Sequence, residues 1–181
     1  VISWSKTLAI GLVVYSTAAI ALIFASGRVG VVADDIYFIP AVTGTLVGAF
    51  LTIKRPENRI GPLMAIMAAS LVTLGASNVL VPWALEQGRD SLVVVGVHLS
   101  DLAWITQFVT ALVLLPLWFP TGRPINRRWA WVGRVAIGSA AVAQVSFIVA
   151  ESVCAYESIL AESCTTVQIP WGIDGFAGFE A

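Results

Sequence analysis

The chain has 181 residues, of which 58% are hydrophobic and 12% are charged, and its formal net charge at pH 7 is −1. Soluble globular proteins carry about 25% charged residues, so this composition excludes a surface exposed mainly to water. The balanced charge, without a basic stripe, indicates that we should expect no nucleic-acid partner. We therefore expect one domain over residues 1–181, an all-α polytopic transmembrane helical bundle whose main partner is the lipid bilayer.

Five apolar runs are long enough to be spanning helices, which need about 20 mostly apolar residues. Pro82 is expected to end the third helix, and Pro116 is expected to loosen the fourth. A polar segment over 153–172 follows the fifth helix, and a sixth helix beginning near Ile173 is left open. The predicted helices cover residues 8–25, 37–53, 60–81, 94–119 and 129–152.

The two ends of the sequence carry further expectations. The first apolar run favours a membrane anchor over a cleaved signal peptide, because it is longer than the usual apolar core of about 7–15 residues. The sequence starts at Val1 without a methionine and stops at Ala181 within an apolar run. We therefore expect the chain to be part of a longer protein.

The basic residues set the predicted orientation, because Lys and Arg resist translocation across the membrane whereas acids contribute little. Eight of the ten basic residues fall on one side of the predicted helices, where Glu57 is the one acid. That side is expected to be the cytoplasm. The protein is then a multi-pass plasma-membrane protein with a cytoplasmic N-terminus and an extracellular segment over 153–172. The eight basic residues are Lys6, Lys54, Arg55, Arg59, Arg123, Arg127, Arg128 and Arg134.

Both cysteines, Cys154 and Cys164, lie in the predicted extracellular segment. The short separation and the oxidising exterior favour a disulfide over two free thiols. Such a bond would stabilise the segment by about 2–3 kcal/mol. Two thiols without a nearby histidine are too few for a metal site, and we expect no metal and no cofactor.

The most costly residue to place is Asp101, about two turns inside the predicted fourth helix. His98 lies three positions earlier and therefore on the same helix face. Ionisable groups inside a membrane usually face the bundle interior or a wet cavity. One hypothesis is an outward-open polar pocket that binds a ligand or senses protons. The alternative is a helix that starts later and leaves both residues at the wet interface. The pocket candidates are His98, Asp101, Asn78, Gln144 and Glu151.

The second helix contains Gly44 and Gly48 in a GxxxG pattern. Small residues allow close backbone approach, and we expect packing within the chain rather than a dimerisation face. The chain has one histidine, no glycine-rich phosphate loop and no nucleophile paired with a base, so it shows no catalytic motif. Whether it belongs to an enzyme is left open.

Two predicted cytoplasmic turns carry motifs that resemble a known family. The sequence KRPENRIGPLM at 54–64 resembles the RRP-x-N-x-IG-x-LL turn in the membrane-sensor regions of actinobacterial sensor histidine kinases. The sequence LPLWFPTGRPINRRWAWV at 115–132 resembles their L-x-FP-x-GR-x-x-x-RRW turn, and Pro-Trp-Gly at 170–172 fits the same layout. The residues that carry the resemblance are Arg55, Pro56, Asn58, Gly61, Phe119, Pro120, Gly122, Arg123, Arg127, Arg128 and Trp129.

The resemblance covers most of the chain from about residue 43 onward. It implies a transmembrane sensory input domain of a two-component system, which relays an external or membrane signal to a cytoplasmic kinase module outside this chain. It supplies no ligand-contact residue, and it leaves open a homodimer through the bundle or through that module. Two other classes stay as alternatives: an accessory or structural subunit of a larger membrane complex, and a transporter component with Asp101 in its pathway. The transporter is disfavoured because the helices show no internal repeat.

Overall fold

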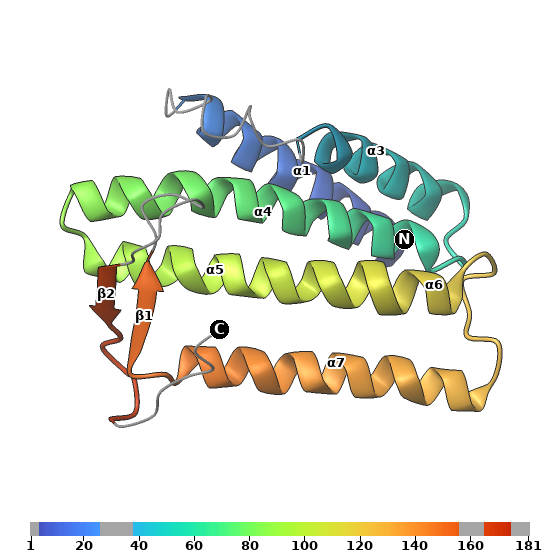
Figure 1. Cartoon of the computed structure of the whole chain (residues 1–181). Helices are drawn as coiled ribbons and strands as arrows, with labels where there is room; N and C mark the ends of the chain where they lie inside the picture. Colours follow the sequence, from blue (N-terminus) through green and yellow to red (C-terminus); the bar gives the residue numbers. More distant parts are fainter. Residues whose placement is uncertain (1–3, 26–37, 156–164, 175–181) are drawn as a thin grey trace.

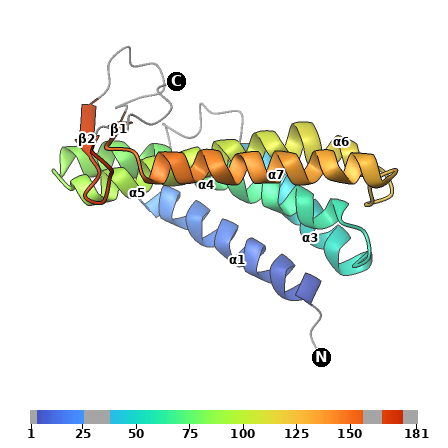
Figure 2. The same cartoon turned by 90° about the horizontal axis from the view of Figure 1, so that it is seen from below.

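The computed structural model describes residues 4–25, 38–155 and 165–174. Its core is a helical bundle in which α4 is central: α1 and α3 pack on one side of it, α5 packs on the other, and α7 lies against α5 (Figure 1). Seen from below, α1 is inclined to the rest of the bundle (Figure 2). The elements are α1 (Trp4–Ala25), α3 (Phe38–Lys54), α4 (Ile60–Glu86), α5 (Asp90–Phe108), η1 (Val109–Leu114), α6 (Leu115–Trp118), α7 (Arg127–Ile148), β1 (Ser152–Ala155) and β2 (Thr165–Gln168).

Among the described residues, four segments are long and apolar enough to cross a membrane. They are Thr7–Phe24, Ile60–Glu86, Asp90–Trp118 and Arg127–Ile148. All five predicted helices are present, but α3 has only 17 residues and falls below the other four in length. The structure thus confirms a mostly helical bundle with four candidate spans.

The third helix is longer than predicted, because α4 passes through Pro82 and ends at Glu86. A proline removes a single backbone hydrogen bond, which neighbouring helices compensate in a bundle. The stop signal is Gly88, which has a φ of +62°. There the amide of Gly88 donates to the carbonyl of Leu85 (3.1 Å) and that of Arg89 to the carbonyl of Ala84 (2.9 Å). This is the Schellman pattern, in which glycine is favoured because a side chain would strain the backbone.

The fourth helix begins at Asp90, four residues before the prediction, and runs without a break through η1 and α6. The π-helical turns of η1 come directly before α6, whose first turn contains Pro116. Proline cannot donate the expected backbone hydrogen bond, and wider π turns accommodate that loss. The predicted loosening at Pro116 is confirmed.

The fifth helix begins at Arg127 because Asn126 caps it. The Asn126 side-chain oxygen accepts from the amides of Arg128 (3.0 Å) and Trp129 (3.1 Å). The helix ends at Ile148, four residues before the predicted end, so Glu151 does not lie on it.

The Asn126 cap supplies a prediction. Replacing Asn126 with alanine is expected to lower the free energy of unfolding by about 1 kcal/mol, because two amides at the start of α7 lose their acceptor. Replacement with aspartate should keep the stability, because its carboxylate accepts the same bonds and interacts favourably with the helix dipole. Unfolding of the detergent-solubilised chain with increasing dodecyl sulfate measures both. Equal midpoints for the alanine and aspartate variants would contradict the capping role.

The chain is not all-α, because β1 and β2 form a two-stranded antiparallel sheet in the segment expected to be a polar loop. Val153 pairs with Val167 in its register, and both side chains are buried. The hairpin covers the ends of α4 and α5, where it completes a core with Val81, Ala84, Val93 and Val94. Residues 173 and 174 are not helical, and a sixth helix beyond them falls outside the described residues.

Glycines bring the backbones of α3 and α4 into close contact. A Cβ added to Gly48 would lie 2.5 Å from the amide nitrogen of Ala65, and one added to Gly61 would lie 2.6 Å from that of Thr52. A Cβ on Gly44 would meet that of Ala68 at 3.0 Å. The GxxxG pattern therefore packs within the chain, as predicted.

Candidate functional site

The two turns that carry the sequence motifs lie at the same end of the bundle, here called the turn end: residues 55–59 between α3 and α4, and 119–126 between α6 and α7 (Figure 1). They are in contact. A Cβ on Gly122 would overlap the side-chain oxygen of Asn58 and lie 2.8 Å from the amide nitrogen of Arg59. The guanidinium of Arg59 lies over the Trp118 ring, 5.4 Å from its centroid. The motifs thus form one structural unit.

Local hydrogen bonds explain why asparagine and glycine stand at this contact. The backbone N–H of Asn58 donates to the carbonyl of Arg55 (2.9 Å). The side-chain oxygen of Asn58 accepts from the backbone N–H of Ile60 (2.9 Å). It therefore closes the turn and holds the first turn of α4. Gly122 has a φ of +74° and donates to the carbonyl of Trp118 (2.7 Å). Its lack of a side chain permits both this backbone conformation and the approach to Asn58.

The remaining motif residues lie mainly on the surface of the turn end. Gly61 is the exception, being buried against Thr52. Within the described part of the chain, the turn-end cations form no ion pair, although Glu57 lies among them. The turn-end cations, all exposed, are Lys54, Arg55, Arg59, Arg123, Arg127 and Arg128. The exposed uncharged motif residues are Pro56, Phe119, Pro120 and Trp129.

His98 lies at the opposite end of the bundle, here called the hairpin end, with β1, β2 and residues 87–89 and 169–174. Both of its ring nitrogens are buried, and neither has a hydrogen-bond partner among the residues that the structure describes. Its ring centroid is 6.4 Å from that of Trp171. The Trp171 indole in turn donates to the carbonyl of Ile148 at the end of α7 (3.1 Å). His98 therefore lies level with the C-terminal end of α7, inside the bundle from the N-terminal end of α5.

Asp101 and Gln144 lie at similar depth on neighbouring helices. At 1.5 Å per residue, Asp101 lies three residues, or about 4.5 Å, further into the bundle than His98. Gln144 lies four residues, or about 6 Å, further into the bundle than Ile148. The helices α5 and α7 are antiparallel neighbours (Figure 1). The Gln144 side-chain oxygen is buried without a partner in the described ranges. The side chain of Asp101 is half-buried.

The other two pocket candidates are less closely associated. Asn78 is half-buried on α4, next to Ser77, whose buried hydroxyl lacks a partner among the described residues. Glu151 lies between α7 and β1, and its backbone carbonyl accepts from the amide of Ile169 (2.9 Å). Sequence reasoning missed Trp171 as a neighbour of His98.

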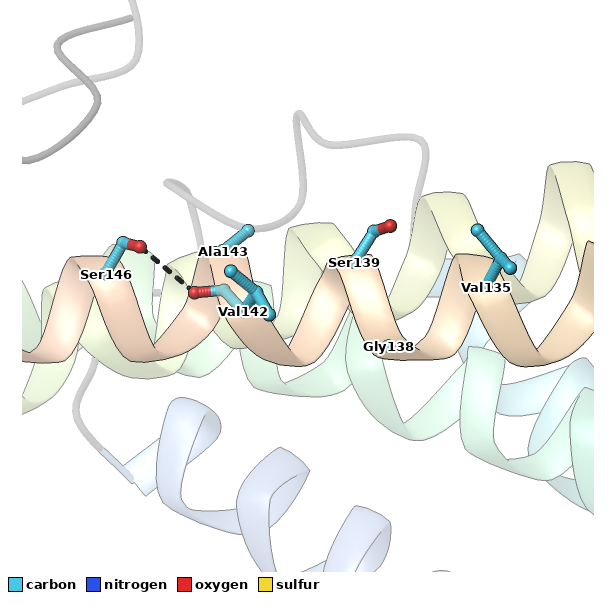
Figure 3. A pocket seen from close by; sticks show the side chains of 6 residues that line it. All are labelled: Val135, Gly138, Ser139, Val142, Ala143 and Ser146. Atoms are coloured by element: carbon cyan, nitrogen blue, oxygen red, sulfur yellow. Dashed lines mark hydrogen bonds between the residues drawn. The ribbon is translucent and has the colours of Figure 1, made fainter.

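An open hollow of about 580 Å³ lies elsewhere, along one face of α7 (Figure 3). The hydroxyl of Ser146 within it donates to the carbonyl of Val142 (3.1 Å), so that group is engaged by its own helix. No predicted site residue lines the hollow. Its lining residues are Val135, Gly138, Ser139, Val142, Ala143 and Ser146.

Asp101 supplies a second prediction. Replacing it with leucine is expected to raise the free energy of unfolding by about 1–2 kcal/mol. The substitution removes a carboxyl group that has no described partner from an otherwise apolar helix. The matched control is Asp90→Leu on the same helix. Asp90 is exposed in the first turn, where an acid interacts favourably with the helix dipole, so this variant should gain nothing. Unfolding midpoints in dodecyl sulfate compare the two. A destabilised leucine variant at position 101 would show that Asp101 has a structural partner.

Cys154 is disulfide-bonded. Its predicted partner, Cys164, lies outside the described residues, so the pairing stays a prediction. Among the described ranges, no three His, Cys, Asp or Glu side chains are grouped to hold a metal ion. No protein-family model, curated protein or solved structure matches the chain.

Proposed function

We propose that this chain is the transmembrane input region of a sensor histidine kinase, with the turn end in the cytoplasm and the hairpin end outside. The observation that carries the proposal is the contact of the two motif turns through Gly122, Asn58 and Arg59. Two motifs that begin 61 residues apart in the sequence, at 54 and 115, resemble one family and belong to one structural unit. The charge distribution supports the orientation, because every turn-end cation is exposed at that end.

The proposal includes α3 as a fifth, short span. Its 17 residues extend about 25 Å, at the lower limit for crossing the hydrocarbon core. An odd number of spans before the loop at 153–172 places that loop outside when the N-terminus is cytoplasmic. The resulting protein is a multi-pass plasma-membrane protein.

Signal relay needs two helix packings that differ by a few kcal/mol and a stimulus that favours one of them. Polar groups without described partners, in His98 and Gln144, lie at a depth similar to that of Asp101 at the hairpin end. The helix that carries His98 continues through η1 to Trp118, which contacts Arg59. A change in the packing of α5 on α7 would therefore reach the turn end through one continuous helix, whose π turns are a suitable point of adjustment.

Phosphorylation of the full-length protein tests the function. In membrane vesicles with radiolabelled ATP, the full-length protein is expected to form an acid-labile, base-stable phosphohistidine. Asp101→Asn should change the extent of labelling or its response to external pH, and Asp90→Asn should not. A reading frame without a kinase core after this chain, or a full-length protein that forms no phosphohistidine, would contradict the proposal.

Cysteine labelling tests the orientation separately. In a background lacking Cys154 and Cys164, single cysteines at positions 57 and 121 should react with an impermeant maleimide only after the cells are opened. A cysteine at position 91 should react in intact cells. Labelling of position 57 in intact cells would reverse the orientation, and labelling of 57 and 121 from different sides would refute the bundle topology.

An accessory subunit is the second candidate, favoured by the wide apolar exposure of α7. Val135, Val142 and Val145 are each 58–68% exposed on it. Stable co-purification with a second membrane protein that is lost on Val142→Arg, with no kinase core in the reading frame, would support this alternative.

A further inference from the structure

The contact between the turns brings two arginines together from distant parts of the sequence. Arg59 follows Asn58 directly, and Arg123 follows Gly122 directly, so the close approach of Gly122 to Asn58 and Arg59 makes these arginines neighbours. Both side chains are exposed. The Trp118 ring holds the Arg59 guanidinium by a cation–π contact, which leaves its N–H edge available as a donor.

No anion in the described part of the chain neutralises this pair of arginines. Neither arginine makes an ion pair with any residue in the described ranges. The six turn-end cations and Glu57 give this surface a net charge of +5. The buried indole N–H of Trp118 also has no acceptor in the part of the chain that the structure describes. Two exposed arginines that come from neighbouring backbone positions, with donors that no described residue engages, suit the recognition of a phosphate group.

We infer that Arg59 and Arg123 form a binding site for the headgroup phosphate of an anionic phospholipid. The charge identifies an anion, and the position identifies its source. The site lies where α4 begins and α6 ends, at the boundary of two candidate spans. Basic sites between spanning helices at this level bind anionic headgroups. The inference depends on the membrane placement of the bundle and not on a kinase module.

The test uses the full chain in nanodiscs that contain equal amounts of phosphatidylglycerol and phosphatidylcholine. Native mass spectrometry of the released protein measures which lipid is retained. The parent chain should retain phosphatidylglycerol preferentially. Arg59→Gln combined with Arg123→Gln should reduce this preference by about 25-fold, since each surface cation contributes about fivefold.

Arg89→Gln is the matched control. Arg89 also lies over a tryptophan ring, that of Trp83, at 5.3 Å, but at the hairpin end. The Arg89→Gln variant should leave the preference for phosphatidylglycerol unchanged. Circular dichroism and gel filtration establish that each variant folds. Arg59→Lys combined with Arg123→Lys keeps the charge but removes the paired donors, and it should lower the preference by a smaller factor. Should the glutamine variant not fold, the lysine variant decides.

Three results would overturn the inference. The first is equal retention of the two lipids by the parent chain. The second is a folded glutamine variant, or failing that a lysine variant, with the full parental preference. The third is displacement of phosphatidylglycerol by inorganic phosphate at the concentration at which glycerophosphoglycerol displaces it, which would assign the site to free phosphate.

Discussion

Replacing Gly48 with leucine is expected to lower the free energy of unfolding by about 3 kcal/mol, because α3 and α4 pack too closely there for any side chain. A single added Cβ would already lie 2.5 Å from the Ala65 amide and 2.9 Å from the carbonyl oxygen of Gly61. These are backbone atoms of α4, which cannot turn away as a flexible side chain can, so the two helices must separate. Unfolding in dodecyl sulfate, followed by circular dichroism, measures the loss.

Gly138→Leu is the matched control for that variant. It places the same side chain on a helix, but a Cβ at Gly138 meets no atom within 4 Å. Its unfolding midpoint should stay within the range expected of an exposed substitution, about 0.5 kcal/mol. A Gly48→Leu protein as stable as the Gly138→Leu protein would show that α3 is not held against α4 in this way.

Replacing Gly122 with alanine should lower the free energy of unfolding by about 3 kcal/mol and separate the two turns. Two effects add. The φ of +74° is strained for a residue with a side chain, by about 1–2 kcal/mol. The new Cβ also meets the Asn58 side chain and the Arg59 amide, which adds about 1–2 kcal/mol of overpacking. The Trp118 fluorescence should shift as Arg59 leaves its ring, in a background with the other six tryptophans replaced by phenylalanine.

Gly88→Ala separates the two effects. Gly88 has a similar φ of +62°, but a Cβ there meets nothing within 4 Å. It should therefore show only the backbone contribution, about 1–2 kcal/mol. The difference between the two variants measures the contact between the turns. Equal destabilisation at positions 88 and 122 would mean that this contact contributes nothing.

The helices were predictable because each is an apolar run, whereas their ends depend on signals that hydropathy does not contain. Gly88 ends α4 through its backbone conformation, and Asn126 starts α7 through its side-chain oxygen. Pro82 has no such effect, although it was the expected stop. A bundle tolerates the loss of the hydrogen bond that proline removes. The end of the helix is therefore set by the residue that allows the carbonyls of the last turn to be hydrogen-bonded.

The hairpin could not be read from the sequence, because each strand has only four residues. Val153 and Val167 are buried by the core at the ends of α4 and α5. The alternation of buried and exposed residues within these strands is too short to stand out from a polar loop. Tertiary contacts decided the local structure here.

The candidate sites were predictable in part. The motif residues were identifiable at once, and the polar residues inside the predicted fourth helix were conspicuous. Their partners were not, since Asn58 and Gly122 are far apart in the sequence, as are His98 and Trp171. No periodicity relates such pairs. Only the chain path, which returns each turn to the same end, brings them together.

The unequal lengths of α3 and α4 have a consequence for the surrounding lipid. The 17 residues of α3 extend about 25 Å and the 27 residues of α4 about 40 Å, yet Gly48 and Ala65 fix the two helices side by side. Hydrocarbon about 30 Å thick matches neither. In the proposed five-span arrangement, acyl chains next to α3 would be compressed, while α4 would relieve its excess length by tilting. Thickening the membrane would then disfavour the short α3, and thinning it would disfavour the long α4.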